Sequence, residues 1–347
     1  MLKQTLEAIG PLNHEIMKQA QYRVDHLIKP VGSLGKLESY YVQLAGIAGS
    51  LKPTLGKKEI IVMAADHGIY EEGIAATDRA VTLAQAENMT IGLTGVCALA
   101  KASGAQVTVV DIGIDADQVK PEVWPRKIRR GTANMAREHA MTRPEAIQAI
   151  EVGIEMANRA IDQGARVLGI GEMGVGNTTP SAAIVSVFSG RPAIEVTGPG
   201  ANLPQDRMGR KVQVIEEAIA QWQPDPSDPI DVLAKVGGLE IGGMAGVILG
   251  AAAKGVPVIV DGFIASASAL LAKGLSEASV AYMIPSHQSM EPGATVAADL
   301  LGFDPPLALD MRLGEGTGAA MMFGVLEAAL AMNNHMITFD EAGFVAP

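Results

Sequence analysis

Short apolar runs alternate with longer Ala-rich segments along most of the chain. The apolar runs are EIIVMAA, QVTVVDI, ARVLGI, AIEVTG, VPVIVDG, SVAYMIP and LALDMRL. Continuous apolar runs of this length are typical of strands buried on both faces, and the segments between them have the length and composition of helices. The pattern therefore predicts an α/β fold with a doubly wound, mainly parallel sheet flanked by helices.

The two ends of the chain follow a different pattern. Residues 1–49 and the segment that begins at residue 318 show helical spacing of apolar positions and no strand-like run. We therefore expect a small helical lobe formed from both termini, residues 1–49 with 318–347. The large α/β domain, residues 50–317, is expected to bind the substrates and carry out the chemistry.

Composition narrows the class of protein. The chain has 347 residues, with 27 Lys and Arg against 38 Asp and Glu, and its net charge of -11 repels nucleic acid and anionic membranes. The single cysteine, Cys97, excludes internal disulfides and thiolate metal clusters, and its apolar surroundings predict a buried, inert thiol. The first residues contain no apolar signal core, and no apolar stretch is long enough to span a bilayer. These features predict a cytoplasmic protein with no nucleic-acid or membrane partner.

Polar or Gly-rich stretches follow most of the predicted strands. They are DHGIYEEG, DIGID, GEMGVGNTT, DGF, SHQSMEPG and GEGTG. In open parallel sheets the ligand crevice lies beyond the carboxyl ends of the strands. We therefore expect these stretches to converge on one site that is built from the whole chain.

The stretch GIGEMGVGNTTPSAA contains a G-x-G-x-x-G pattern at Gly169, Gly171 and Gly174. In a dinucleotide fingerprint the third glycine lies in the first turns of a helix. Here Pro180 is best placed at the first helical position with Thr179 as its cap, so the glycines precede the helix and the loop is too long for that turn. The favoured interpretation is an anion site made by backbone N–H groups and a helix N-terminus.

Two alternatives for this stretch stay open. Glu195 lies about 20 residues further on, where a ribose-binding acid is expected, so an NAD-dependent oxidoreductase is one alternative. The stretch is also compatible with a strand-to-helix connection that binds nothing.

Two acids lie in predicted crevice loops. Glu315 stands between Gly314 and Gly316, with Thr317 able to cap the helix that follows. Its carboxylate is either a charge that favours a helix N-terminus or a base held over the crevice. Glu172, inside the proposed phosphate loop, is interpreted as orienting a ribose hydroxyl or a base.

Other polar groups have both a functional and a structural interpretation. Arg207, Arg210 and Lys211 form the densest basic cluster between two crevice loops, or a solvated helix face. Ser286, His287 and Ser289 offer phosphate or ribose contacts, or caps of the next helix.

The Asp66–His67 pair is a weak metal-site candidate because no second His or Cys ligand is nearby, and it is more typical of a pair that fixes a loop. The segment AIEVTGPG has one acid, Glu195, where transferases that use pyrophosphorylated ribose usually have two adjacent acids, which disfavours a Mg-pyrophosphate donor.

Several long motifs occur in a fixed order between about residues 10 and 335. They are KPVGSLGKLE, AADHG, IRRGTANM, GEMGVGNTTPSAA, VTGPGANL, DGFIASASAL, SHQSMEPG and DMRLGEGTGAA. In these motifs the chain resembles the nicotinate-nucleotide dimethylbenzimidazole phosphoribosyltransferase family.

The resemblance implies an activity and an assembly. The family transfers phosphoribose from nicotinate mononucleotide to 5,6-dimethylbenzimidazole, which yields nicotinate and α-ribazole 5′-phosphate for the lower ligand of cobalamin. It implies a homodimer that binds these two small molecules and uses no cofactor and no metal. The base used in the cell stays open, because Thr77 is often Ser in relatives and the flanking residues Asp78 and Arg79 differ from the usual pattern.

The resemblance also implies roles for individual residues. Glu315 matches the family's catalytic carboxylate. The phosphate and ribose contacts match Gly174, Gly176, Asn177, Thr178, Lys211 and Ser289, and the base pocket matches Thr77, Gln85 and Leu313.

The implied chemistry agrees with these residue types. Nicotinate leaves from a cationic pyridinium and departs neutral at nitrogen, so the leaving group needs no metal. As the benzimidazole nitrogen bonds to the anomeric carbon, positive charge builds on the imidazole and its N–H proton passes to a carboxylate. Besides the oxidoreductase, a sensor that binds nicotinate mononucleotide without turnover is the remaining alternative.

Overall fold

The computed structural model describes residues 1–344 and shows a six-stranded sheet with the order β3-β2-β1-β4-β5-β6. All five neighbouring pairs of strands are parallel. The strand order reverses between β1 and β4, which confirms the predicted doubly wound α/β fold. The strands are β1 Lys57–Ala65, β2 Gln106–Gly113, β3 Trp124–Pro125, β4 Ala165–Met173, β5 Val258–Val260 and β6 Met283–Pro285.

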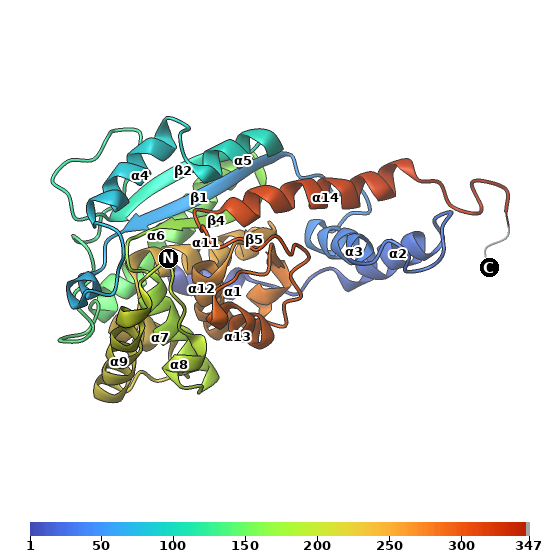
Figure 1. Cartoon of the computed structure of the whole chain (residues 1–347). Coiled ribbons are helices and arrows are strands. Elements are labelled where there is room, and N and C mark those ends of the chain that lie inside the picture. The colour runs from blue at the N-terminus through green and yellow to red at the C-terminus, as the bar shows by residue number, and fades with distance from the viewer. Residues whose placement is uncertain (345–347) are drawn as a thin grey trace.

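Helices connect the strands and cover both faces of the sheet (Figure 1). Before β1 lie α1 Leu2–Ala8, α2 His14–Asp25 and α3 Lys36–Ala48. Between β1 and β4 lie η1 Gly68–Glu72, α4 Ala80–Thr90, α5 Gly95–Ser103 and α6 Arg143–Asp162. Between β4 and β5 lie α7 Thr178–Ser189, α8 Ala193–Val196, α9 Gln205–Trp222, α10 Pro229–Val236 and α11 Leu239–Ala253. The remaining helices are α12 Phe263–Leu275, η2 Glu277–Tyr282, α13 Pro292–Leu301 and α14 Thr317–His335.

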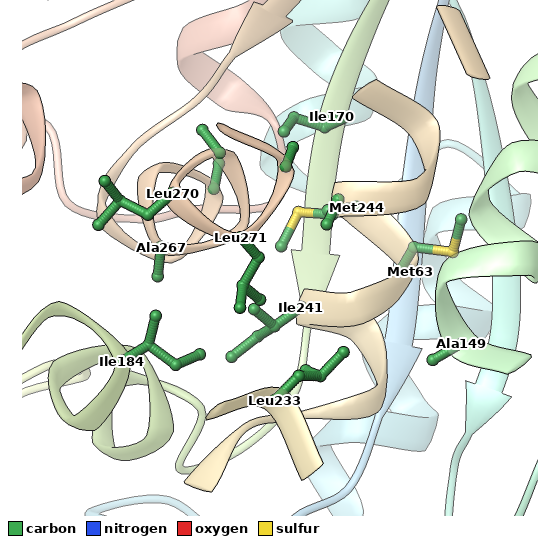
Figure 2. Close-up of a cluster of buried hydrophobic side chains, with 14 of the residues drawn as sticks. Met63, Ala149, Ile170, Ile184, Leu233, Ile241, Met244, Ala267, Leu270 and Leu271 are labelled. Atoms are coloured by element: carbon green, nitrogen blue, oxygen red, sulfur yellow. The ribbon is translucent and has the colours of Figure 1, made fainter. Parts of the chain in front are cut away.

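The two faces of the sheet belong to two different apolar clusters. Alternate side chains of β1 enter one cluster, with Ile61, Met63 and Ala65, and the other, with Ile60, Val62 and Ala64. Figure 2 shows part of the first cluster, where Met244 of α11 points toward Ile170 of the sheet and Met63 lies on the side of Ala149 of α6. Burial on both faces explains why the strands appear in the sequence as continuous apolar runs.

Helices α6 and α11 pack closely on the first face. A Cβ atom added at Gly153 would lie 1.9 Å from the carbonyl oxygen of Gly243, and one added at Gly246 would lie 1.9 Å from that of Ile150. The two backbones are therefore in direct contact, and the position of α11 relative to the sheet is fixed by glycine.

The terminal helices do not all pack on one another. Helices α2 and α3 pack together, and α3 packs against α14, whereas α1 packs against α6 and α11. Helix α14 also contacts α5 and strands β1, β4 and β5, so it runs from the sheet out to α3 (Figure 1). The boundaries of the lobe, 1–49 with 318–347, stay a prediction, and residues 345–347 lie outside the described residues.

Two predicted strands are absent from the sheet of residues 1–344. The segment AIEV forms helix α8, because Ala193 and Val196, three residues apart, are buried whereas Ile194 is 64% exposed. The segment LALDMRL follows Pro305 and Pro306, which cannot donate ladder hydrogen bonds, and Leu307 forms an isolated bridge to His287 instead of a strand. Most of the predicted strand SVAYMIP is the 3₁₀ helix η2, followed by β6. Among residues 1–344, no helix combines the length and the apolar character needed to cross a membrane.

Candidate active site

A cavity of about 540 Å³ opens at the carboxyl edge of the sheet. It is lined by segments that follow β1, β4, β5 and β6 and by the loop that leads into α14. The expected convergence of strand-end stretches is therefore confirmed for these segments. The stretch DIGID after β2 is different, since Asp115 N donates to Asp66 Oδ2 at 2.8 Å and, within the described chain, the stretch does not line the cavity.

The glycine-rich connection from β4 to α7 is shorter than predicted. Helix α7 begins at Thr178 with Asn177 as its N-cap, so the predicted start at Pro180 is wrong by two residues. Only residues 174–177 separate the strand from the helix, so the prediction of a long loop is wrong as well. Asn177 takes the cap position because the turn at Gly176, with φ of +93°, already directs the chain into the helix.

The dinucleotide interpretation nevertheless fails on the placement of the glycines. Gly169 and Gly171 lie inside β4, and Gly174 lies in the loop rather than in the helix. A Cβ atom at Gly171 would lie 2.3 Å from the carbonyl oxygen of Glu315, so this glycine makes room for the loop before α14. Glu195 lies on α8, where it is exposed, pairs with Arg191 at 3.4 Å and does not line the cavity.

Glu315 lies in a short loop in which three consecutive residues have left-handed backbones. Its φ is +62°, and those of Gly314 and Gly316 are +86° and +92°. Its buried carboxylate accepts a hydrogen bond from Val96 N at 3.1 Å through Oε2 and one from Gln85 Nε2 at 3.3 Å through Oε1. Val96 is in the first turn of α5, so the carboxylate is at the positive end of that helix.

The N-terminus of α14 is capped by a residue from another strand end. Asp261, which follows β5, accepts hydrogen bonds from the amides of Gly318 at 2.6 Å and Gly316 at 3.0 Å. The prediction that Thr317 caps this helix is wrong, since Thr317 is its first residue and donates through Oγ1 to Gly314 O at 2.8 Å. Asp261 thereby leaves the carboxylate of Glu315 available to the cavity.

Glu172, at the end of β4, is buried beside Glu315. Its Oε1 accepts a hydrogen bond from the amide of Glu315 at 3.2 Å, and its Oε2 accepts one from Asn177 Nδ2. Burial raises the pKa of Glu172 to about 8, and the nearby carboxyls of Asp261 and Glu240 add to this effect against the two hydrogen bonds. At neutral pH this side chain is therefore mostly a neutral carboxylic acid.

Lys211, on α9, is buried directly behind the start of α7. Its Nζ donates to Thr178 Oγ1 at 2.8 Å and to Gly198 O at 2.8 Å. Burial lowers the pKa of Lys211 to about 8, and the negative charge of Glu291 opposes this shift.

The other two members of the basic cluster are turned away from Lys211. Arg207 is exposed and donates to Gly73 O at 3.4 Å, and Arg210 pairs with Glu72. Within the described chain, Lys211 is the one cation of the three that donates a hydrogen bond to Thr178 in the cavity wall.

The structure brings the predicted site residues together. Lys211 contacts the cavity only through Thr178, and Thr77 and Leu313 lie at its exposed rim, where Leu313 is 60% exposed. The cavity is lined by Glu315, Glu172, Gly174, Gly176, Asn177, Thr178, Ser289, Thr77, Gln85 and Leu313. Their individual roles stay predictions.

Several cavity residues were not singled out from the sequence. Asp261, Glu291 and Arg312 all line the cavity. Glu291 accepts a hydrogen bond from Gly200 N at 2.9 Å, and burial raises its pKa. Asp261 and Glu291 lie in the strand-end stretches DGF and SHQSMEPG, and Arg312 lies in the motif DMRLGEGTGAA, so their positions in these motifs are the signal that the sequence offers.

Two other residues singled out from the sequence, His67 and Cys97, make contacts within the fold. His67 Nε2 lies 2.8 Å from Glu240 Oε1 in a fully buried pair, and residues 1–344 contain no group of three His, Cys, Asp or Glu side chains that could hold a metal ion. Cys97 is only partly buried, contrary to the prediction: it packs against the edge of the second apolar cluster, and its Sγ donates to Met89 O at 3.1 Å.

Comparisons with known proteins agree with this geometry. A family model described as Phosphoribosyltransferase matches residues 9–344. A nicotinate-nucleotide dimethylbenzimidazole phosphoribosyltransferase of Alkaliphilus metalliredigens is 53% identical over 343 residues, which cover 99% of this chain and 98% of that protein. The chain belongs to this phosphoribosyltransferase family.

Other members of the family are also similar over their full length. The nicotinate-nucleotide dimethylbenzimidazole phosphoribosyltransferase of Geobacter sulfurreducens is 49% identical over 344 residues, covering 99% of this chain and 98% of that protein. The crystal structure of CobT from Thermus thermophilus superimposes with a TM-score of 0.92 at 39% identity, covering 96% of this chain and 100% of that one. The resemblance inferred from the motifs is confirmed.

Proposed function

We propose that this phosphoribosyltransferase transfers phosphoribose from nicotinate mononucleotide to 5,6-dimethylbenzimidazole, which yields nicotinate and α-ribazole 5′-phosphate for the lower ligand of cobalamin. The observation that carries the proposal is a cavity with two buried charged groups beside it. The carboxylate of Glu315 lies in the cavity wall, and the ammonium of Lys211 lies directly behind that wall. The full-length identity to relatives named for this activity supports the choice of donor and acceptor.

At the acceptor end, Glu315 is held by neutral partners. The amide of Val96 and the side chain of Gln85 orient the carboxylate without neutralising it. A carboxylate has about four lone-pair positions, so two hydrogen bonds leave it free to accept the benzimidazole N–H. The other ring nitrogen then faces the ribose.

At the donor end, the phosphate binds where backbone N–H groups converge. The amides of Val175, Asn177 and Thr179 donate within the protein, so other amides of the loop 174–177 and the first turn of α7 bind the phosphate, together with the positive end of the helix dipole. Lys211 adds a positive charge through Thr178, and Ser289 contacts the phosphate or ribose from the β6 side.

The chemical step is a substitution at the anomeric carbon. The bond from this carbon to the pyridinium nitrogen breaks, and its electron pair leaves with neutral nicotinate nitrogen. The benzimidazole nitrogen forms the new bond on the opposite face, so the β donor gives an α product, and the N–H proton passes to Glu315. Glu172, as a neutral acid bonded to the amide of Glu315, orients a ribose hydroxyl or the base.

The test combines the protein with nicotinate mononucleotide and dimethylbenzimidazole and measures free nicotinate and the new riboside by chromatography. Both products should form in equal amounts, and EDTA should leave the rate unchanged. Binding of nicotinate mononucleotide without product would favour the sensor, and tight binding of reduced NAD with fluorescence transfer would favour the oxidoreductase.

The proposal includes a cytoplasmic homodimer. It is supported by the family membership and by a composition with one cysteine, which is free. Light scattering coupled to size-exclusion chromatography should give about twice the mass of the 36.1 kDa chain.

A further inference from the structure

The rim loop, residues 304–314, contributes Asp310, Arg312, Leu313 and Gly314 to the cavity lining. It is attached to the segment after β6 by hydrogen bonds from Gln288 N to Leu307 O at 2.9 Å and from Met290 N to Met311 O at 3.3 Å. These bonds bring Arg312 next to the segment that ends at Glu291. Arg312 lines the cavity, and its side chain is exposed.

The cavity is poor in positive charge for an enzyme with an anionic donor. Among the described residues that line it, Arg312 is the one Lys or Arg. The carboxyl groups that line it belong to Glu172, Asp261, Glu291, Asp310 and Glu315. Within residues 1–344, the guanidinium of Arg312 has no hydrogen bond and no ion pair within 4.0 Å, so it is free to bind a ligand.

Three charged side chains influence one another here: Lys211, Glu291 and Arg312. Burial raises the pKa of Glu291, and the positive charges of both Lys211 and Arg312 oppose this shift, so Glu291 lies within electrostatic reach of both cations. When Lys211 and Glu291 are both ionised, their charges cancel. A phosphate monoester carries about -1.5 to -2 charges at pH 7, so Lys211 alone does not make this region positive. Arg312 adds the second positive charge.

We propose that Arg312 binds the donor phosphate from the cavity rim and so determines the preference for phosphorylated donors. This inference rests on the proposed function. A guanidinium suits the task because its planar fork of N–H donors matches two phosphate oxygens and because it is always charged. Lys211 is buried and fixed by two hydrogen bonds, whereas the exposed Arg312 side chain can close over the phosphate after it enters.

The experiment compares Arg312→Gln with the wild-type enzyme on three donors: nicotinate mononucleotide, nicotinamide mononucleotide and nicotinate riboside. The first two carry the phosphate, and the first and third carry the ring carboxylate. We expect the KM of both phosphorylated donors to rise about 10- to 100-fold, as for loss of a charge-assisted contact, with kcat/KM for the riboside unchanged within about twofold. Arg312→Lys should lie between the two enzymes, because it keeps the charge and loses the fork.

Arg191→Gln is the matched control. It removes the same charge from an exposed residue just beyond the far end of α7, about 18 Å along the helix from Thr178 at 1.5 Å per residue. Its kinetics should equal those of the wild type on all three donors, and the melting temperatures of all variants should agree.

Other results would overturn the inference. An unchanged KM in Arg312→Gln would mean that the guanidinium binds nothing. A loss confined to nicotinate mononucleotide and its riboside would assign Arg312 to the ring carboxylate, and an equal loss on all three donors would assign it to the fold. A wild-type enzyme that produces no riboside from any donor overturns the proposed function itself, a result that differs from each of these.

Discussion

The two ends of the cavity hold opposite charges in the same way. At one end the Glu315 carboxylate is bound by an amide N–H and a glutamine side chain, and at the other end the Lys211 ammonium is bound by a hydroxyl and a carbonyl. Neither group has an ion-pair partner within 4.0 Å among residues 1–344. Neutral partners orient a charge without cancelling it, so both charges remain available to a ligand.

The two ends differ in how the backbone supports the charge. Lys211 lies inside the long helix α9, where its position follows from ordinary helix packing against α7. Glu315 has a left-handed backbone, and neighbouring elements must approach it closely at Gly171 and Gly95, where an added Cβ would lie 2.3 Å from its carbonyl oxygen and 3.3 Å from its Oε2. A non-glycine residue in this conformation costs free energy and is typical of functional sites. The comparison teaches that the Glu315 carboxylate needs a more elaborate backbone support than the Lys211 ammonium.

The largest expected effect is that of Glu315→Gln. The amide keeps the size and can still accept a hydrogen bond, but it cannot take the proton. We expect kcat to fall by about 10²- to 10⁴-fold, the usual contribution of a general base, with the Kd of the donor and the melting temperature near wild type. Steady-state kinetics, donor titration and thermal unfolding on this variant measure the three quantities.

The opposite pattern would mean that Glu315 has a structural role rather than a catalytic one. If Glu315 only stabilises the N-terminus of α5, the free energy of unfolding should drop by about 0.3 to 1 kcal/mol while kcat barely changes.

The next effect is on donor binding through Lys211→Met, which removes the charge and nearly keeps the side-chain volume. A charge-assisted contact contributes about 1.5 to 3 kcal/mol, so the KM of the donor should rise about 10- to 150-fold, and the KM of the base should not change. Equal increases for both substrates would mean that the variant disturbs the whole cavity.

The pKa of Lys211 adds a pH dependence to the same experiment. The ammonium is charged below its pKa of about 8, so kcat/KM for the donor should fall in the wild type as pH rises through that value. The fall assigned to Lys211 should be missing in Lys211→Met. A fall of the same size in both enzymes would assign it to another group.

A separate effect concerns the pH dependence of stability near Glu172, which lies between the two ends. Its pKa is raised from 4.5 to about 8, so the folded state holds a proton that the unfolded state releases above 4.5. The stabilisation is therefore complete below pH 4.5 and is lost as pH rises to about 8, with a slope of at most about 1.4 kcal/mol per pH unit. Glu172→Gln mimics the protonated acid and should unfold with a smaller pH dependence in this window, which denaturant titrations at several pH values measure. Parallel curves for the two proteins would contradict the raised pKa.

The fold was largely predictable because most of its strands are buried on both faces. Burial makes β1, β2 and β4 continuous apolar runs, and such runs are visible without knowledge of the tertiary structure. The segment AIEV has the same composition but forms α8, because contacts with α7, α9 and α13 decide its conformation. In so short an apolar segment, tertiary packing outweighs local preference.

The site was predictable where motifs carried the information and not where only tertiary contacts did. Glu315 and the loop 174–177 lie in long motifs, so the sequence indicated both. Arg207, Arg210 and Lys211 are chemically alike in sequence, and only the packing of α9 shows that Lys211 is the buried one. Asp261 was missed because its partners are backbone amides of residues 316–319, and no side-chain pattern records such a bond.

Helix α14 has a consequence for biosynthesis. It is the last helix of the described chain to leave the ribosome, yet it packs against α3, one of the first, and its N-terminus carries the loop with Glu315 (Figure 1). During translation, the face of α3 that α14 covers therefore stays exposed until almost the entire polypeptide has been made. Nascent chains arrested before α14 would keep that face exposed to chaperones and proteases.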